Sequence, residues 1–257
     1  MQDPAIQQSQ QEAFSIEFHF SADLRFFLPK PNEGGTLIRI LREKTSVKDA
    51  IEACGVPHPE IDLIHCDGVI VPLEHQLTTN GVVQVYGVAS SPASAGEALQ
   101  ARGITKFVAD GHLGKLTRDL RLLGFDVLYS STIDDVELVT VSTRQDRALL
   151  TRDRRLLMHK VVHHGYCPRS HDPDAQVIET IRRFQLKELI MPFTRCIHCN
   201  GILAKVDKRD VLEELEPLTR FYYDHFRRCL SCRKIYWSGS HFGKLQARVD
   251  KIRSRLG

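Results

Sequence analysis

Three aspartates in the second half of the chain stand where carboxylate chemistry is expected. Asp110 follows the apolar run 104–109, Asp153 follows the apolar run 148–151, and Asp135 opens a helical pattern between them. If the runs are parallel strands, these residues share the edge where the strands end, which is where ligands bind in open α/β sheets. Carboxylates gathered there suit Mg²⁺ or Mn²⁺. Such an ion can activate a water for attack on a phosphodiester.

Each aspartate also has a purely structural explanation. Asp is a favoured helix N-cap, and Asp110, Asp135 and Asp153 all precede helical stretches. A cap needs only one residue, whereas the position of all three at one edge favours a metal site. Other polar residues near this edge could contact phosphate or be ordinary exposed side chains: His112, Lys115 and Arg152.

Four of the seven cysteines form two Cys-x-x-Cys pairs, Cys196/Cys199 and Cys229/Cys232, with 29 residues between the pairs. Together they match the tetrahedral four-sulfur site of a structural zinc, which leaves no open position for catalysis. The gap exceeds the usual zinc-ribbon range, and we attribute it to an insertion with a helix-like segment, 208–216. Disulfides are the weaker alternative because the cysteine count is odd and a reducing compartment is expected. Two histidines are weaker substitute ligands: His198 and His225.

A C-terminal helix is predicted to carry an apolar stripe and a basic stripe side by side. The apolar stripe is Leu245, Val249, Ile252 and Leu256, and the basic stripe is Lys244, Arg248, Lys251 and Arg255. A row of cations can follow a phosphate backbone. Aromatic residues nearby could stack on unpaired bases: Phe221, Tyr222, Tyr223, Tyr236 and Trp237. The alternative places these aromatics in a small zinc core and the cations in solvent.

Charge is distributed unevenly along the 257 residues. Residues 1–99 hold 6 Lys+Arg and 13 Asp+Glu, a net charge of −7, and the remainder holds 29 and 19, a net charge of +10. The basic part suits a polyanion, and the acidic part suggests a module that does not touch nucleic acid. No apolar stretch approaches the roughly 18 residues that span a bilayer. Residues 1–11 lack the features of a secretory signal, so we expect a reducing, cytoplasmic location.

The small, polar segment 90–103 predicts a flexible linker between two domains. Ahead of it, alternating apolar residues over 14–20 predict a strand. Further strands are predicted at 37–41, 61–65, 69–71 and 82–88, and one short helix is predicted at 47–53. This order resembles the ubiquitin-like β-grasp fold of small sulfur carriers. Those carriers end in a free Gly-Gly, whereas Gly87 continues into the linker, so we expect residues 14–89 to have a docking or regulatory role.

Behind the linker, predicted strands alternate with predicted helices. The strands are 104–109, 127–129 and 148–151, and the helices are 113–123, 135–144 and 173–184. Alternation of this kind indicates an α/β fold whose sheet is parallel and whose crossovers are right-handed.

Two motifs in this part, Asp110-Gly-His-Leu-Gly-Lys-Leu-Thr-Arg-Asp-Leu-Arg-Leu-Leu-Gly-Phe-Asp126 and Leu149-Leu-Thr-Arg-Asp-Arg-Arg-Leu-Leu157, resemble the PIN-like mut-seven C-terminal RNase domain. The resemblance continues through Arg195-Cys-Ile-His-Cys-Asn-Gly201, Cys229, Cys232 and Tyr236-Trp-Ser-Gly-Ser-His241 and covers about residues 104–245. Bacterial members of this family commonly carry an N-terminal ubiquitin-like domain. The resemblance implies a PIN-like RNase domain at 104–190 and a zinc ribbon with a basic C-terminal helix at 191–257.

In PIN-like nucleases, the aspartates that follow the first strand and a later strand bind the metal. The resemblance therefore implies metal ligation by Asp110 and Asp153, with Asp135 completing the site. A fourth acid is common in such sites, and Asp146 and Asp174 are the candidates here.

The leading hypothesis is metal-dependent hydrolysis of RNA, with Mg²⁺ or Mn²⁺ at the aspartates and a structural zinc in the ribbon. The residues expected to contact RNA are Lys115, Arg152, Lys244, Arg248, Lys251 and Arg255. One alternative is a noncatalytic RNA-binding or ribonucleoprotein adaptor, in which the aspartates are helix caps. Another is a sulfur-transfer partner that acts through the β-grasp domain, and the internal position of Gly87 argues against it.

Overall fold

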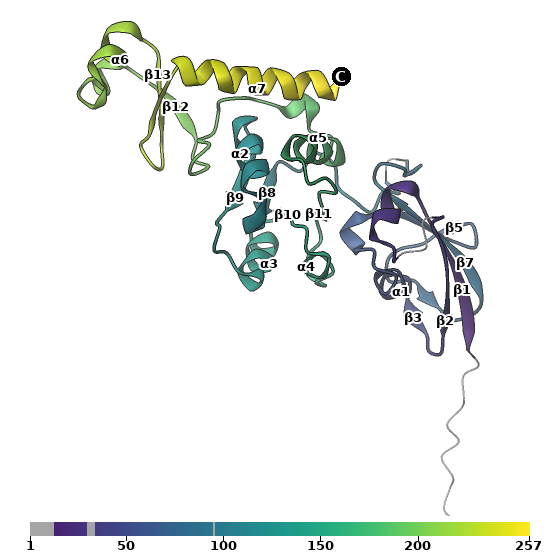
Figure 1. Ribbon diagram of the computed structural model, residues 1–257. Helices are drawn as coiled ribbons and strands as arrows, with labels where there is room; N and C mark the ends of the chain where they lie inside the picture. Colours follow the sequence, from purple (N-terminus) through teal and green to yellow (C-terminus); the bar gives the residue numbers. More distant parts are fainter. Residues whose placement is uncertain (1–12, 30–33, 95) are drawn as a thin grey trace, which may run out of the picture. The chain divides into compact units, whose positions relative to one another are not determined.

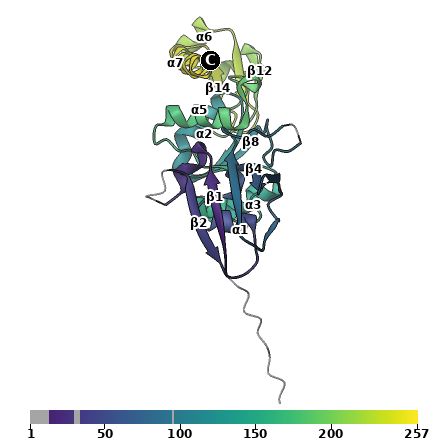
Figure 2. The same ribbon diagram turned by 90° about the vertical axis from the view of Figure 1, so that its right-hand side faces the viewer.

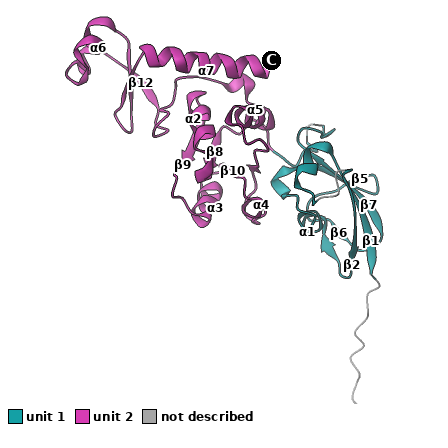
Figure 3. Cartoon of the chain, in the orientation of Figure 1, with its two compact units in different colours: residues 1–100 teal, residues 101–257 magenta. Residues whose placement is uncertain are grey.

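The computed structural model describes residues 13–29, 34–94 and 96–257. The chain forms two compact units, residues 1–100 and residues 101–257, which are coloured separately in Figure 3. We describe each unit by itself. The segment 1–11, in which no secretory signal was expected, lies outside the described residues.

The first unit is a mixed five-stranded sheet with the order β2-β1-β7-β4-β5. Its strands are β1 (Phe14–Phe20), β2 (Thr36–Leu41), β4 (Ile61–Cys66), β5 (Val69–Ile70) and β7 (Gly81–Gly87). The two central strands, β1 and β7, are parallel, and the other pairs are antiparallel. Figure 2 shows β1 and β2 side by side. This topology confirms the predicted β-grasp fold.

Alternation in β1 places every second side chain in the core of this unit, because successive residues of a strand point to opposite faces. Phe14 and Phe18 are buried, whereas Ser15 between them is exposed. Helix α1 (Val47–Glu52) begins at Ser46, whose hydroxyl accepts a hydrogen bond from the Asp49 N–H at 3.0 Å. A further pair of two-residue strands, β3 (Thr45–Ser46) and β6 (Gln76–Leu77), is too short to leave a periodic signal.

The predicted linker ends in residues that are bound to the two units. Leu99 N–H donates to the carbonyl oxygen of Asp62, and Gln100 is buried with its Nε2 donating to the Ile61 carbonyl oxygen at 3.0 Å. Gly103 N–H donates to the Phe184 carbonyl oxygen in the second unit. The domain bounds at 14–89, 104–190 and 191–257 stay predictions.

The second unit contains a four-stranded parallel sheet with the order β11-β10-β8-β9. Its strands are β8 (Lys106–Ala109), β9 (Asp126–Tyr129), β10 (Ala148–Leu150) and β11 (Gly165–Tyr166). Its helices are α2 (Gly114–Leu122), α3 (Asp135–Arg144), α4 (Arg154–Leu157) and α5 (Pro173–Phe184). Helices α2 and α5 lie side by side (Figure 1). Their buried side chains share one core with Phe107 and Ala109 of β8. The predicted parallel α/β sheet is confirmed.

A second, antiparallel sheet follows, made of β12 (Leu203–Val206), β13 (Phe226–Cys229) and β14 (Ile235–Trp237). The insertion between β12 and β13 forms two short 3-10 turns and helix α6 (Pro217–Tyr222). The segment 208–216 is therefore not one helix. Val211 and Leu215 do bury on one side against Phe226, but the backbone at Val211 has φ −123° and leaves the helical region.

Helix α7 (Ser240–Leu256) runs from this sheet along α5 (Figure 1). The four residues of its apolar stripe pack into the same core as buried residues of α2 and α5, and Val249 and Ile252 are fully buried there. The predicted apolar stripe thus holds the helix against the parallel-sheet part of the unit. Within the residues that the structure describes, no helix combines the length and apolar character needed to cross a membrane.

Candidate functional site

Asp110 and Asp153 lie at the same carboxyl edge of the parallel sheet, because they follow the neighbouring strands β8 and β10. Thr151, which is completely buried, connects them. Its Oγ1 donates a hydrogen bond to Asp110 Oδ2 at 2.8 Å and accepts one from the Asp153 N–H at 3.0 Å. The Asp110 N–H donates to the carbonyl oxygen of Leu150 at 3.0 Å. These bonds fix the two loops that carry the aspartates to each other.

Both aspartates also cap the turns that follow them. Asp110 Oδ1 accepts from the His112 N–H at 3.0 Å, and Asp153 Oδ1 accepts from the Arg155 N–H at 2.8 Å. Each aspartate therefore caps a turn and also lies at the shared edge of the sheet, as the two explanations from the sequence predicted. Asp110 is half-buried and Asp153 is exposed.

Asp135 is the first residue of α3 and is exposed. The sequence suggested that Asp135 caps this helix, and that interpretation is wrong. Asp134 is the cap, because its Oδ1 accepts from the Glu137 N–H at 2.7 Å. Asp135 lines a cavity of about 430 Å³ that Leu156 of α4 also lines. Among the described residues, the only group of three or more possible metal ligands within 4.8 Å of one another is the cysteine group below, so the three aspartates are not gathered this closely.

Two glycines allow the loops at this edge to approach closely. Tyr129 Oη, at the end of β9, donates to the Gly111 carbonyl oxygen at 2.9 Å. A Cβ at Gly111 would lie 3.1 Å from the Ser131 carbonyl oxygen, and one at Gly114 would lie 2.8 Å from Tyr129 Oη. The two glycines of the Gly-His-Leu-Gly sequence after Asp110 thus favour the close packing of this edge.

The remaining predicted residues of this edge are dispersed. Lys115 is exposed in the first turn of α2. Arg152 directs its guanidinium nitrogens at the ring of His171, at 2.8 and 3.0 Å, and sequence reasoning missed this histidine. Asp146 precedes β10 and so lies at the amino end of the strand, whereas Asp153 follows its carboxyl end.

Most of the predicted basic stripe is bound to carboxylates of the same unit. Arg248 Nη2 lies 2.5 Å from Asp119 Oδ2, and its Nη1 lies 2.6 Å from Asp174 Oδ1. Lys251 Nζ lies 2.6 Å from the other oxygen of Asp174, and Arg255 Nη1 lies 3.9 Å from it. The hydrogen bond from Lys251, aided by Arg248, lowers the pKa of Asp174. These ion pairs attach α7 to α2 and α5, and a role of the stripe in RNA contact stays a prediction.

Replacing Arg248 by Met is expected to lower the free energy of unfolding by about 2 kcal/mol, because three charge-assisted hydrogen bonds are lost and the half-buried Asp119 loses its counter-charge. Urea unfolding followed by circular dichroism would measure the change. Lys244→Met, on the exposed side of the same helix, is the control and should leave stability unchanged. Equal stability of the two variants would show that the ion pairs do not hold α7.

The four paired cysteines gather into one cluster, with all four Sγ atoms within 4.8 Å of one another. The chain turns tightly between the first two, since Cys196 N–H donates to the Gly201 carbonyl oxygen at 2.7 Å. A Cβ at Gly201 would lie 2.7 Å from Cys229 Sγ, so only glycine fits there. This set of soft sulfur donors suits a tetrahedral zinc. The exposed His198 and His225 are not part of the cluster.

Hydrogen bonds around the cluster favour the thiolate form of Cys196. Burial raises the pKa of this thiol, but hydrogen bonds from Tyr236 Oη, at 3.0 Å, and from backbone N–H groups outweigh burial and bring it to about 7. The N–H groups of Cys199 and Cys232 point at Cys196 Sγ and Cys229 Sγ, at 3.4 and 3.5 Å. Because metal ligands must be deprotonated, this setting fits a metal-binding role.

An ion-pair cluster joins the cysteine loop to the parallel sheet. Asp126, the first residue of β9, accepts hydrogen bonds from Arg147 Nη1 and Asn200 Nδ2, both at 2.7 Å, and Arg195 Nη2 lies 3.2 Å away. Asn200 Oδ1 accepts in turn from the Val127 N–H at 3.0 Å. This cluster was not predicted from the sequence, because its members come from distant parts of the chain.

Asp126→Asn is expected to lower the free energy of unfolding at neutral pH by about 3 kcal/mol, because it leaves buried Arg147 without its counter-charge. Burial raises the pKa of Asp126, but hydrogen bonds from Arg147 and Asn200 outweigh it and lower the pKa below the ordinary value. The stabilisation that the Asp126 charge provides is therefore complete above about pH 4, the ordinary pKa of an aspartate. It is lost as the pH falls through the lower pKa that Asp126 has in the folded protein.

Urea titrations at neutral and acidic pH would test this prediction. The difference between wild type and Asp126→Asn should shrink on acidification. Asp146→Asn, at an exposed position, is the control. A difference that does not change with pH would mean that the charge of Asp126 is not the stabilising feature.

Two family models match the chain. The model described as the Mut7-C RNAse domain matches residues 105–249, and the model described as Mut7-C ubiquitin matches residues 13–92. Comparison with curated proteins and with solved structures finds no match. The first match spans more than half of the 257 residues, and both agree with the resemblance drawn from the motifs. The protein therefore belongs to the Mut7-C RNAse domain family and carries a Mut7-C ubiquitin-like domain ahead of the RNAse domain.

Proposed function

We propose that this protein hydrolyses RNA phosphodiester bonds in a reaction that depends on Mg²⁺ or Mn²⁺. Asp110 and Asp153 would hold the ion, with Asp135 as the third acid. The observation that carries the proposal is the buried Thr151 hydroxyl, which bonds both aspartate segments at the carboxyl edge of neighbouring strands. A cap alone does not require this connection between β8 and β10.

The donor set fits a hard cation. Mg²⁺ is commonly held by one or two carboxylates while it keeps several waters, so Asp110 and Asp153 suffice without a close third ligand. A bound ion would activate a water and neutralise charge on the leaving oxygen. Thr151 fixes the rotamer of Asp110 through its hydrogen bond to Oδ2. Arg152 and Lys115 supply positive charge near the edge for the phosphates of the substrate.

The other parts of the chain would support this reaction. We assign a structural zinc to the cysteine cluster, on the grounds of its four thiols and its N–H···S hydrogen bonds. We assign protein docking to the β-grasp unit, because the sheet face of β2 exposes Ile38 by 65% and Ile40 by 72%. Exposed apolar side chains next to each other on one strand face are typical of interaction surfaces.

An RNA cleavage assay tests the proposal. Purified protein would be mixed with labelled single-stranded and structured RNAs, with added Mg²⁺ or Mn²⁺ or with none. Cleavage that appears with the ion and disappears after its removal, while the zinc content stays constant, is the expected result. Equal cleavage with and without the added ion would contradict metal dependence.

A noncatalytic RNA-binding adaptor is the second candidate, and a specific observation favours it. Asp110, Asp134 and Asp153 each accept backbone N–H groups at the start of a turn or helix, which gives these acids a structural role without metal. RNA binding without cleavage under every ion condition would establish this candidate in place of the nuclease.

A further inference from the structure

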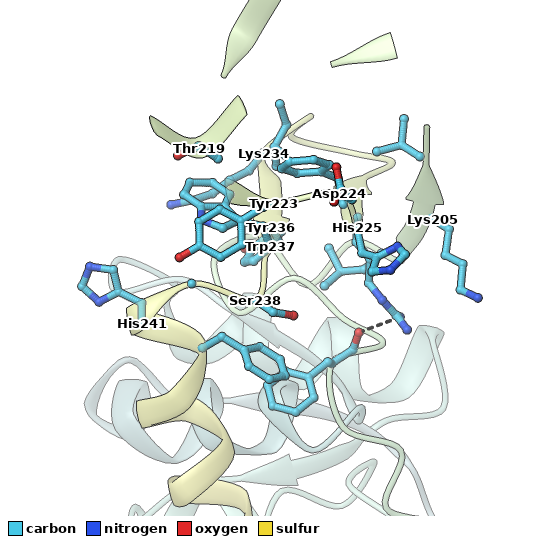
Figure 4. Close-up of a pocket in the computed structure, with 18 of the residues that line it drawn as sticks. Lys205, Thr219, Tyr223, Asp224, His225, Lys234, Tyr236, Trp237, Ser238 and His241 are labelled. Atoms are coloured by element: carbon cyan, nitrogen blue, oxygen red, sulfur yellow. Dashed lines mark hydrogen bonds between the residues drawn. The ribbon is translucent and has the colours of Figure 1, made fainter. Parts of the chain in front are cut away.

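A groove of about 1470 Å³ lies on the ribbon part of the second unit, and we call it the ribbon groove. It is lined by strands β13 and β14, by the end of α6 and by the start of α7. Figure 4 shows the rings of Tyr223, Tyr236 and Trp237 close together on one side, with His241 of α7 below them. None of Asp110, Asp135 and Asp153 lines this groove.

Some aromatic side chains of the groove are not buried in the core of the ribbon. The buried members of that core are Val211, Leu215 and Phe226, with half-buried Tyr223 packed against them, whereas Trp237 is 39% exposed and Tyr222 is 68% exposed. A Cβ at Gly239 would lie 2.8 Å from Trp237 Nε1, so the absence of a side chain there lets the indole rest on the backbone. The indole is therefore held in place while it remains accessible.

The rim of the groove is positively charged. Among the described residues that line it, six are Lys or Arg and three are Asp. One of the three acids, Asp224, forms an ion pair with Lys208 at 2.8 Å, so these two charges cancel and do not change the net charge of the rim. Lys205, Lys234 and Lys244 are exposed. An occupant must therefore combine negative charge with flat apolar surfaces that can lie on aromatic rings.

We propose that the ribbon groove binds single-stranded RNA, with unpaired bases stacked on Trp237 and Tyr223 and with phosphates near Lys205, Lys234 and Lys244. The identity of the polyanion as RNA rests on the proposed function. A base-paired helix hides its base faces in its own stack, so it could use the lysines but not the rings. Combined aromatic and cationic contacts of this kind are the general basis of binding to single strands.

Trp237 is the only tryptophan in the chain, so its fluorescence reports on the groove directly. The protein would carry Asp110→Asn to prevent cleavage and would be titrated with a short unstructured RNA, with a hairpin of equal length, and with polyglutamate. We expect the unstructured RNA to quench the emission and to bind about tenfold more tightly than the hairpin. Equal quenching by the hairpin would overturn the single-strand assignment, and quenching by polyglutamate alone would indicate an acidic protein as the occupant instead.

Variants in the same background separate stacking from charge, with the anisotropy of labelled RNA as the measurement. Trp237→Leu should weaken binding about tenfold, since base stacking on an aromatic ring contributes of that order or more. Lys234→Ala and Lys205→Ala should each reduce the slope of log affinity against log salt by about 0.7. Met191→Ala and Lys160→Ala are the controls, exposed residues of the same unit that do not line the groove.

Zinc content and urea unfolding would establish that each variant is folded. If Trp237→Leu fails to fold, the two lysine variants and the wild-type quenching still decide the question. Groove variants that bind like the controls would overturn the ribbon groove even if the wild type cleaves RNA. Quenching and salt slopes as expected, without any cleavage in the wild-type protein, would overturn the nuclease proposal but leave the groove in place.

Discussion

Asp110→Asn and Asp153→Asn are each expected to lower the rate of RNA cleavage by about 10²- to 10³-fold. The expected loss reflects the several kcal/mol that a properly held metal ion contributes to such a reaction, at about 1.4 kcal/mol for each factor of ten. The fold should survive, since asparagine keeps one oxygen that can accept the N–H of His112 or of Arg155. The double variant should lose little more than either single variant, because the two ligands act as a unit.

Single-turnover cleavage of a labelled RNA at saturating Mg²⁺ would measure these rates. The matched control is Asp172→Asn, because Asp172 caps α5 through hydrogen bonds from the Asp174 and Ala175 N–H groups. Asparagine is as good an N-cap as aspartate, so this variant should keep its stability and should leave the cleavage rate unchanged. If the Asp110 and Asp153 variants cleave as fast as the Asp172 variant, the aspartates are caps and the active site lies elsewhere.

Helices and strands were predicted correctly from the sequence where apolar residues recur at the spacing of a strand or of a helix. The strict alternation of β1 and the helical spacing of Leu116 and Leu120 in α2 identify their elements without tertiary information. The two-residue strand β11 has no such period, and it forms because Leu149 and Leu150 of β10 offer a free neighbouring edge. The same holds for β3 and β6, which pair only after the rest of the first unit brings them together.

The candidate site was predicted in its residue types but not in its connections. Both aspartates could be assigned from their positions after strands, yet Thr151 looked like the last residue of a strand, and its two hydrogen bonds depend on how β8 and β10 lie side by side. The carboxylate partners of the basic stripe were not predicted, for a similar reason. One partner, Asp119, lies 129 residues from Arg248, a separation over which sequence patterns carry no information about contact.

Cys229→Ser is expected to remove zinc from the protein and to unfold the antiparallel sheet β12–β14. The strands of this sheet contribute to two small apolar clusters, whose buried members are Cys196, Leu203 and Cys229 in one and Val211, Leu215 and Phe226 in the other, and this is too little to hold three short strands. Structural zinc sites contribute on the order of 10 kcal/mol to folding, so loss of the ion should outweigh all other contacts of the ribbon. The parallel sheet should persist, because its core does not include those clusters.

Zinc analysis and the emission of Trp237 would report the result, because the indole of this β14 residue should become fully solvated and shift to longer wavelength. Cys66→Ser, a thiol of the first unit outside the cluster, is the control and should keep both zinc and the native emission. Binding of single-stranded RNA should fall with the zinc content, since the ribbon groove is built on β13 and β14. A Cys229→Ser protein that retains native Trp237 emission without zinc would show that the ribbon folds without the metal, and the cluster would then need a role other than structural support.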